Sequence, residues 1–501
     1  MKRMLAYETT AAGGGTAGDG EFKRARGAGG LLHNSRPTRE GRKAAGPRRG
    51  RRPRSLAGLP VVVLTLLPAA ALAAGTIADV VDGATDASVR SVLPDRLSRP
   101  VAIELALAAN PTLAAMEARV NAARGRAWQA GRWSNPALTF AVEEWPVDEG
   151  GGFDDAKQTV GVQQQLPWPG KPGLDHRLGA TAVRLRNTLR RLQEVELVRD
   201  VKVAFARTLA ARESVAIGEQ LVALAESSAT TAGRRVGAGA APLQEQLRTE
   251  VQLARVRADA AGLRRDLARA QHGLAALLGR PDLTGVELEG DLPAGGDDRL
   301  LQAAPAGWPD EHPSVVAAIL ALDRAELGYR RARLEPYPDI TAGVAGGRLG
   351  ETDRSIVEFS LSIPLPLIDS SRGRKDEAAA NVGVAGAELR GVRVQLAREW
   401  AVARQRYRTA AEQAASYRDE ILPKTDEALR LVQAGFDEGK FGFIDLLDTQ
   451  RTTAQTRFAF QQVRLDLAIA RAELEALLET SPDAPRPMTF PGQRPSRSPV
   501  P

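Results

Sequence analysis

The sequence predicts a mainly helical protein with a few β-strands, built as two copies of one structural unit. The first observation is a repeat, because Gly239 recurs as Gly439 and Leu277 as Leu477, each 200 positions further on. Such a long period marks a duplicated structural unit. The second observation is composition: only 4% of the residues are aromatic, which favours long helices over a large β-rich core. The third is that each copy contains two segments of alternating apolar and polar residues, which predict β-strands.

Short proline motifs keep the same order in both copies. The corresponding pairs, first copy before second, are Asn110-Pro111 and His312-Pro313, Asn135-Pro136 and Tyr337-Pro338 (both offset by 202), and residues 166–169 and 363–366 (offset by 197). We therefore predict the order helix, strand, strand, long helix, turn, helix in residues 100–279 and again in 309–480. The Pro-, Gly- and Asp-rich residues 280–308 connect the copies, and the Pro-rich residues 481–501 are predicted to be a disordered tail.

A secretory signal is predicted ahead of the first copy. Residues 1–54 hold 14 Lys+Arg and 4 Asp+Glu, so the rest of the chain carries −3 of the total charge of +7. This basic extension is predicted to be disordered, and without it the charge does not indicate nucleic-acid binding. Residues 55–74 combine a short apolar run with a cleavage site at Ala71-Leu72-Ala73, as in a signal peptide. The alternative, a membrane anchor, would need about 20 apolar residues, so we expect an exported protein without a transmembrane helix.

Periodicity and proline positions define the elements of each copy. The long helices are predicted from stretches with helical spacing and few or no prolines, and Asn-Pro or Gly-rich turns end them. In the first copy we expect a helix at 100–131, strands at 137–143 and 158–163, and helices at 173–235 and 242–279. In the second copy we expect a helix at 310–335, strands around 340–344 and 357–363, and helices at 372–434 and 443–479. The two shorter helices of a copy, stacked end to end, match the long one in length, so we expect a thin wall of antiparallel coiled-coil helices.

The strands have the pattern of transmembrane β-strands. Each is close to the 9–11 residues of a tilted spanning strand, and one face is apolar while the other carries Glu143, Gln163, Glu358 and Ser360. The predicted lipid-facing residues are Leu138, Phe140, Val142, Val160, Val162, Val357, Phe359 and Leu361. An ordinary antiparallel sheet of a soluble protein would alternate in the same way. If the strands do span, four of them cannot close a barrel, and several chains must share one.

Four segments carry a family resemblance, namely residues 105–111, 135–138, 163–171 and 439–451. Over about residues 100–480 the chain resembles the TolC-like outer-membrane efflux proteins, and residues 167–171 and 439–448 look most like the heavy-metal (cobalt–zinc–cadmium) branch. The resemblance implies a homotrimer in the outer membrane of a Gram-negative bacterium. Three chains would share a twelve-stranded transmembrane β-barrel, and their helices would form a periplasmic α-barrel. The helix tips would meet a periplasmic adaptor (membrane-fusion) protein and, through it, an inner-membrane pump of the resistance-nodulation-division type.

The first residues of the final helix are candidates for a periplasmic gate. Asp445 and Asp448 lie three residues apart and so share one face of the helix. The simpler interpretation is that they are solvated acids placed favourably at a helix N-terminus. The resemblance implies that these positions narrow the entrance, where rings of acids would favour cations. In the first copy Glu245 corresponds to Asp445, but Arg248 corresponds to Asp448, so we expect a gate that differs between the copies.

Glycines mark the predicted tips, at Gly237, Gly239, Gly435 and Gly439, with Lys440 beside them. They would permit a positive φ in the turn and also allow an adaptor backbone to approach. No catalytic motif is found, since Pro172 follows Gly170-Lys171 and breaks the phosphate-loop pattern, and the four histidines lack ligand spacing. We therefore expect no enzyme activity, no cofactor and no dedicated metal site.

The leading hypothesis is an outer-membrane channel of a tripartite efflux system, which exports heavy-metal cations or another substrate that the pump selects. The alternative is a periplasmic adaptor, which also has a signal and a helical hairpin. An adaptor needs one hairpin and a lipoyl-like β-domain, whereas this sequence predicts two hairpins with a strand pair before each.

Overall fold

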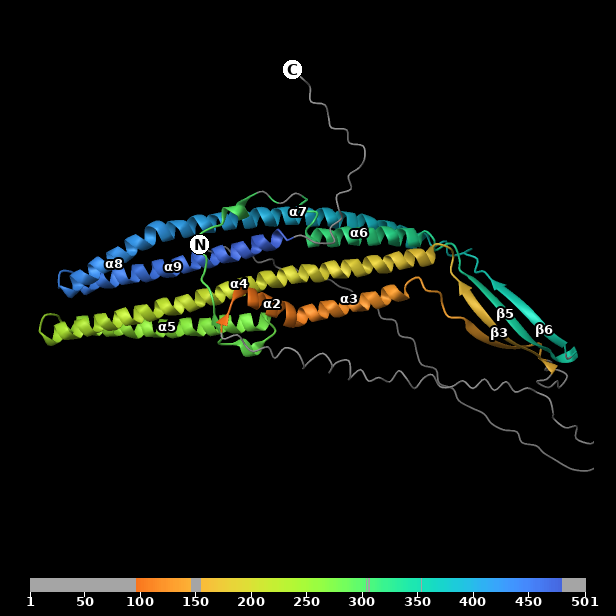
Figure 1. The fold of residues 1–501 in the computed structure, drawn as a ribbon, viewed down its shortest axis with the longest axis horizontal. Helices are drawn as coiled ribbons and strands as arrows, with labels where there is room; N and C mark the ends of the chain where they lie inside the picture. The colour runs from red at the N-terminus through yellow and green to blue at the C-terminus, as the bar shows by residue number, and fades with distance from the viewer. Residues whose placement is uncertain (1–95, 146–154, 303, 305–306, 353, 480–501) are drawn as a thin grey trace, which may run out of the picture. The chain divides into compact units, whose positions relative to one another are not determined.

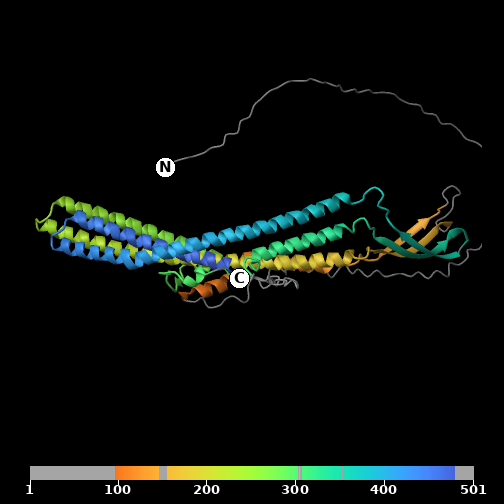
Figure 2. The ribbon, with the colours of Figure 1, turned by 90° about the horizontal axis from the view of Figure 1, so that it is seen from above.

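A computed structural model describes residues 96–145, 155–302, 304, 307–352 and 354–479. The predicted extension, signal peptide and C-terminal tail lie outside these residues. The chain divides into two units, residues 1–89 and 90–501, and all the elements below belong to the second. In that unit the β-sheet lies at one end of the long helices and the two helix–turn–helix tips lie at the other (Figures 1 and 2).

The first half contains an uninterrupted helix of 67 residues, α4 (Lys171–Gly237). Its length agrees with the absence of internal breakers, because Pro172 falls in the first turn, where its missing N–H has no partner to lose. α3 (Pro111–Gln129) and α5 (Leu243–Leu277) both pack along α4. The predicted helix 100–131 is wrong as one element: it is divided into α2 (Arg99–Ala109) and α3 at Asn110, with a bend of 44°. Pro111 causes this break because the residue before a proline disfavours helical angles.

From α3 onward, the order of helices recurs in the second half with one difference. α6 (Pro313–Ala332) and α9 (Phe443–Leu477) pack along α7 (Arg372–Ser416). The predicted helix 372–434 is interrupted, since α7 passes through one π-turn, η5 (Tyr417–Ile421), into α8 (Leu422–Asp437). Pro423 explains the interruption, because it cannot donate to the carbonyl four residues earlier and its ring crowds that carbonyl.

Two side chains join the short helices end to end. Asn110 accepts a hydrogen bond from the Thr112 N–H at 2.8 Å, which caps α3, and its amide donates to the Leu277 carbonyl at the end of α5 at 2.9 Å. His312 caps α6 by accepting from the Ser314 N–H at 3.2 Å, and its ring also bonds to the Ala476 backbone near the end of α9. The predicted end-to-end stacking along the long helices is thus confirmed, and it explains why both Asn110 and His312 precede a proline.

The helices form a row in which α4 is central. α3 and α5 lie on one side of α4, α6 and α9 on the other, and α7 packs on the far side of α6 and α9 (Figures 1 and 2). The buried apolar side chains form several separate clusters, the largest between α2, α4, α5 and the connector. Within the described residues no single helix is long and apolar enough to cross a membrane; α2 and α3 pass that test only as a bent pair.

The four longer strands form one antiparallel sheet in the order β2-β3-β5-β6. Their bounds are β2 Ala137–Glu143, β3 Lys157–Leu166, β5 Ile340–Leu349 and β6 Arg354–Ser362. The two inner strands come from different halves of the chain, so the sheet joins the halves. The remaining short elements are β1 Arg96–Leu97, which pairs in parallel with β4 Glu287–Leu288, and the 3-10 turns η2 Pro281–Leu283, η3 Asp298–Leu301 and η4 Gly350–Thr352.

The connector between the halves is held against the helices by its own backbone carbonyls. Arg212 of α4 donates to the Leu288 and Gly290 carbonyls at 2.5 and 2.9 Å. Arg404 of α7 and Arg418 of η5 donate to the Leu301 and Ala294 carbonyls at 2.6 and 3.1 Å. Because the donors come from both halves, the connector is bonded to both α4 and α7 and links them.

Candidate functional site

The two helix tips have the same turn geometry. After α4, the Ala240 N–H donates to the Arg235 carbonyl at 2.8 Å and the Gly239 N–H to the Val236 carbonyl at 3.0 Å. After α8, the Lys440 and Gly439 N–H groups make the equivalent bonds at 2.7 and 3.0 Å. This is the Schellman arrangement, in which the residue after the helix takes a left-handed conformation. Gly239 and Gly439 have φ of +73° and +80°, so these two positions require glycine.

The other two predicted tip glycines have different surroundings. A Cβ at Gly435 would lie 2.2 Å from Cδ2 of Phe441, so the Phe441 ring packs directly on that backbone. Among the described residues, a Cβ at Gly237 would meet no atom within 4 Å. Lys440 is exposed and pairs with Glu438. Gly435 therefore has a packing reason to be glycine, whereas Gly237 occupies open space.

A small apolar cluster, which the sequence did not single out, supports the second tip. Phe436 is fully buried and packs with Phe443 and Leu446. The guanidinium of Arg235, from the first tip, lies 5.1 Å from the centre of the Phe436 ring. This cation–π contact links the two hairpins. The same guanidinium lies 3.5 Å from the Glu245 carboxylate, so Arg235 connects one hairpin's acid to the other hairpin's core.

The predicted gate residues fall into two environments. Asp445 and Asp448 are both exposed on the first turns of α9. The Asp445 carboxylate accepts from the Gly442 N–H at 3.1 Å, which is the capping role of the third helical residue. For Asp448, the part of the chain that the structure describes contains no hydrogen bond or ion pair. Glu245 is turned toward Arg235 and is partly buried, so it does not share the open position of the two aspartates.

A groove of about 520 Å³ separates the two hairpins near their tips. Its apolar wall contains Leu247 and Val251 of α5 and Ile444 of α9, all of them more than half exposed. Arg248 and Arg255 add positive charge on the α5 side. The structure thus places Arg248, the counterpart of Asp448, in a groove that α9 also lines.

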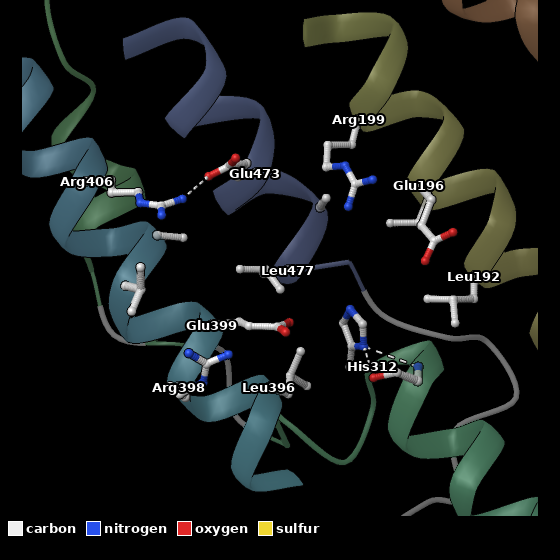
Figure 3. A pocket seen from close by; sticks show the side chains of 15 residues that line it. Leu192, Glu196, Arg199, His312, Leu396, Arg398, Glu399, Arg406, Glu473 and Leu477 are labelled. Carbon is white, nitrogen blue, oxygen red and sulfur yellow. Dashed lines mark hydrogen bonds and ion pairs between the residues drawn. The ribbon is translucent and has the colours of Figure 1, made fainter. Parts of the chain in front are cut away.

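A second cavity lies where α6 and α9 meet end to end, with a volume of about 440 Å³ (Figure 3). Arg406 and Glu473 pair across it at 3.5 Å, and His312 points in from the start of α6. Burial lowers the pKa of His312 below its usual 6.5, although a backbone bond and nearby carboxylates oppose this. Within the described ranges, no group of three or more His, Asp or Glu residues could hold a metal ion. The cavity therefore offers mixed charges without a ligand set.

One face of the sheet is apolar and uncovered in the described chain. All eight predicted lipid-facing residues are exposed, from 44% for Val162 to 85% for Phe359. The register shows that they share a face, because Leu138 lies opposite Val162, Val162 opposite Val344, and Val344 opposite Phe359. Val344 therefore belongs to this face as well.

The other face of the sheet is polar and closely packed. Lys157 pairs with Glu143 at 2.9 Å and also with Glu358. A Cβ at Gly347 would come within 2.0 Å of the Gln158 carbonyl oxygen. The absence of a side chain at Gly347 lets the β3 and β5 backbones approach each other closely here.

A largely buried ion pair joins the two halves at the junction between the strands and the helices. Lys171, at the start of α4, is 6% exposed, and its ammonium lies 2.9 Å from Asp339, just before β5. The Trp168 N–H donates to the same carboxylate at 2.9 Å, and its ring stacks on Tyr337 with centres 5.2 Å apart. Partial burial would raise the pKa of Asp339, but the bonds from Lys171 and Trp168 hold it below the usual value. The sequence offered one signal, the Pro-Trp-Pro-Gly-Lys motif, but not its partner.

This sequence and fold are similar to those of known proteins. Residues 102–280 and 310–480 match the profile of the outer membrane efflux protein family. The cobalt-zinc-cadmium resistance protein CzcC of Cupriavidus metallidurans is 26% identical over 389 residues, which cover 75% of this chain and 89% of that protein. The nickel-cobalt-cadmium resistance protein NccC of Alcaligenes xylosoxydans xylosoxydans is 28% identical over 304 residues, 59% of this chain and 67% of that protein. The fold is similar to that of the outer-membrane channel OprN, with a TM-score of 0.65 at 20% identity, covering 76% and 90% of the two chains.

Proposed function

Because the chain belongs to the outer membrane efflux protein family, we propose that three copies of it enclose one continuous duct from the periplasm to the cell exterior. The family and the resistance proteins make the chain an outer-membrane channel component of an efflux system in a Gram-negative bacterium. Its family and structural neighbours are channel proteins.

The apolar sheet face carries the proposal. Nine large apolar residues on four strands form one uncovered surface, and such a surface needs a partner or a lipid environment. In lipid every strand edge must be paired, which a sheet of four strands cannot achieve alone. Three copies would supply twelve strands and close the barrel, with the apolar face toward lipid and the Lys157 face toward the lumen.

The ends of the helix row support the same assembly. α7 forms one end of the row and exposes Val384, Val394 and Val402. We propose that this apolar surface packs against the α3 and α5 end of a neighbouring copy and closes a helical barrel in the periplasm. If residues 100–279 and 309–480 are two copies of one unit, the trimer holds six such units around the duct.

The tips are the proposed contact with a periplasmic adaptor, which would connect the channel to an inner-membrane resistance-nodulation-division pump. Gly237, Gly239, Gly439 and Lys440 would form the docking surface, whereas the predicted tip residue Gly435 is buried beneath the Phe441 ring and would not take part. The competing adaptor role finds no support in the fold, because the described chain has two helical hairpins, each preceded by a strand pair.

We propose that Asp445 and Asp448 form the selective part of the gate. Both are exposed, whereas Glu245 is paired with Arg235. Three chains would therefore present six carboxylates from second tips only, and acid rings favour cations. The first tips would contribute Arg248 instead, which makes the entrance alternate in charge.

Divalent heavy-metal cations are the proposed cargo. This rests on the names of the two relatives, a cobalt-zinc-cadmium and a nickel-cobalt-cadmium resistance protein. The proposal is tested by deleting the gene and comparing growth in cobalt, zinc, cadmium and nickel, with the intact gene and an empty plasmid as controls. Restored tolerance only with the intact gene, together with trimer bands in the outer-membrane fraction that dissociate on heating, is the expected result. Purely soluble periplasmic protein would contradict the channel, and unchanged metal tolerance would contradict the cargo.

A further inference from the structure

The end of α3 next to the sheet carries an arginine that is held in place by a tryptophan. The Arg132 guanidinium carbon lies 3.7 Å from the centre of the Trp128 ring, and Arg132 Nε donates to the Trp128 carbonyl at 3.0 Å. Trp128 is 66% exposed. Within the described residues, the two terminal nitrogens of Arg132 make no hydrogen bond or ion pair. A guanidinium fixed on a ring with its outer N–H groups free presents a planar fork for phosphate oxygens.

The turn after α3 is fixed against the start of α4. Gly131 has a φ of +76°, and a Cβ at this position would lie 3.3 Å from the His176 Cβ. A Cβ at Gly179 would lie 2.8 Å from the Ala127 Cα. The end of α3 thus packs beside the beginning of α4, so the two helices are antiparallel. Arg132 is therefore held beside the first turns of α4.

Trp128 and Arg177 lie on the same side of this helix pair. Ala127 and His176 are contact positions, and the residue after each of them is rotated by about 100° around its helix axis. Antiparallel helices turn in opposite senses when they are viewed from one end, so both rotations lead to one side of the pair. Arg177 is exposed, and its guanidinium has no acidic partner in the described ranges.

This side is the outer side of the proposed barrel. A Cβ at Gly218 would lie 2.8 Å from a Leu263 atom of α5, and Gly218 follows His176 by six heptads, so the neighbours of α4 keep a seven-residue repeat. Arg212 follows Arg177 by five heptads and donates to the connector carbonyls. The connector therefore covers the same side of α4. Three connectors on the inner side would fill the duct, so they must lie outside it.

Positive charge is concentrated where α3 and α4 adjoin the sheet (Figure 1). Residues 111–135 and 171–190 hold 9 Lys+Arg and 2 Asp+Glu, whereas the chain after residue 54 carries −3 in total. The excess lies directly beside the apolar sheet face, which is the proposed lipid contact. Basic residues next to a membrane-embedded surface are attracted to anionic lipid headgroups.

Arg132 and Arg177 lie at the depth of the headgroups. Leu138, an exposed residue of the apolar face, follows Arg132 by six residues. Arg177 lies about 9 Å from the start of α4, and side chains of a helix tilt toward its N-terminus, here toward the sheet. The headgroup zone extends about 5–7 Å beyond the hydrocarbon, a depth that a long arginine side chain reaches. Arg184, one heptad further, lies about 20 Å from the start of α4 and is outside this zone.

We infer that Trp128, Arg132 and Arg177, which we call the headgroup patch, bind the phosphate of an anionic phospholipid in the periplasmic leaflet of the outer membrane. The Arg132 fork takes the phosphate oxygens, Arg177 adds a second positive charge, and the Trp128 ring lies at the membrane–water interface. The inference rests on the proposed membrane position of the sheet and adds the lipid class and the residues that recognise it. A neighbouring copy beyond α3 contacts the side opposite α4 and leaves the patch free.

Lipid binding to the detergent-extracted protein tests the inference. The chain is purified from outer membranes and titrated with phosphatidylglycerol or with phosphatidylcholine of the same acyl chains, and bound lipids are counted by native mass spectrometry. Each basic residue near a membrane surface contributes about fivefold in affinity, so phosphatidylglycerol should bind several-fold more tightly. Arg132→Gln should weaken its binding about fivefold, and Arg132→Gln with Arg177→Gln more than about tenfold, with phosphatidylcholine binding unchanged.

Two arginines on the same helices provide matched controls. Arg126→Gln removes the same charge from α3, but Arg126 precedes the contact residue Ala127 and is turned to the opposite side. Arg184→Gln removes a charge from the same side of α4, one heptad further from the sheet. Both controls should leave the affinity for phosphatidylglycerol within about twofold, because charges beyond a Debye length are screened. The melting temperature of each variant shows whether it is folded.

The outcomes separate the inference from the proposed channel. Equal affinity of wild type for the two lipids, or equal losses in the controls and in Arg132→Gln, overturns the headgroup patch. Equal losses for both lipids in Arg132→Gln, with a lowered melting temperature, assign Arg132 a structural role and overturn it too. Inorganic phosphate that binds alone at the same concentrations overturns the lipid assignment. A membrane-bound trimer without lipid preference leaves the channel standing, whereas a soluble periplasmic chain overturns the channel and the inference together.

Discussion

Replacing Asp339 with asparagine should lower the stability of the junction between sheet and helices by about 3 kcal/mol. The Lys171 ammonium lies 2.9 Å from this carboxylate, with side chains 7% and 26% exposed for lysine and aspartate. Removing one partner of a buried ion pair costs about 3–5 kcal/mol. The lower end applies because Asp339 is a quarter exposed and therefore partly screened. Asparagine keeps an oxygen that can accept from the Trp168 N–H, so the variant isolates the loss of charge.

The double variant Lys171→Met with Asp339→Asn is the matched control. It removes the buried ammonium as well, and well-packed apolar replacements of buried pairs are often neutral. It should therefore recover most of the loss. Thermal unfolding of detergent-solubilised protein, followed by circular dichroism at one fixed scan rate, provides the comparison, because unfolding of such a chain can be irreversible.

The pH dependence of the difference in melting temperature between wild type and Asp339→Asn gives a second test. The folded-state pKa of Asp339 lies below its usual 3.8, so the pair contributes fully above that value and its contribution is lost as pH falls through the lowered pKa. The gap between wild type and Asp339→Asn should stay constant from about pH 5 to 8. A single variant that melts with wild type at pH 7, or a double variant that melts as low as the single, would refute the reasoning.

Three other predictions follow from the joints, the tips and the gate. Because the pKa of His312 is lowered in the folded state, the neutral ring contributes its full stabilisation above pH 6.5, and this contribution declines as pH falls below 6.5. His312→Asn should remove the decline in melting temperature between pH 7.5 and 5.5. A wild-type melting temperature that does not change between these pH values would contradict the prediction. Gly435→Ala should cost about 1–3 kcal/mol by displacing a packed ring, whereas Gly237→Ala should change stability by less than about 1 kcal/mol; equal melting points would argue against this. Asp445→Ala with Asp448→Ala should raise single-channel conductance in a planar bilayer and weaken block by multivalent cations, with Asp448→Asn as the variant that leaves capping intact; unchanged conductance and block would exclude the gate role.

Local pattern was sufficient for most of the fold. Helical spacing without breakers predicted α4 to within a few residues, and alternation predicted which side of each strand is apolar. It failed where one residue changes the hydrogen bonding of a helix. Pro111 divides the first helix and Pro423 produces a π-turn, although the surrounding periodicity continues through both.

The partners of the candidate site residues could not be predicted, because they are distant in sequence. Lys171 and Asp339 lie 168 residues apart, as the register of β3 with β5 requires. Glu245 corresponds to Asp445 by its position in the repeat, which predicts a similar environment. In the structure Asp445 is exposed, whereas Glu245 is partly buried and pairs with Arg235. A repeat predicts equivalent backbone positions, whereas the environment of a side chain depends on which element lies beside it.

The contacts between the two halves of the chain differ in chemistry from the surfaces that the chain leaves exposed. Contacts between the two halves include ion pairs, such as Arg464 with Glu213 at 2.6 Å and Arg331 with Asp175 at 2.9 Å. Such pairs are costly to bury unless their geometry is correct, and they penalise a wrong register. α7 and one face of β6 instead expose valine, leucine and phenylalanine. Apolar contact is non-directional and drives association wherever matching surfaces meet. In this distribution the ion pairs specify how the halves fit together, and the exposed apolar surfaces remain available for contacts outside the chain.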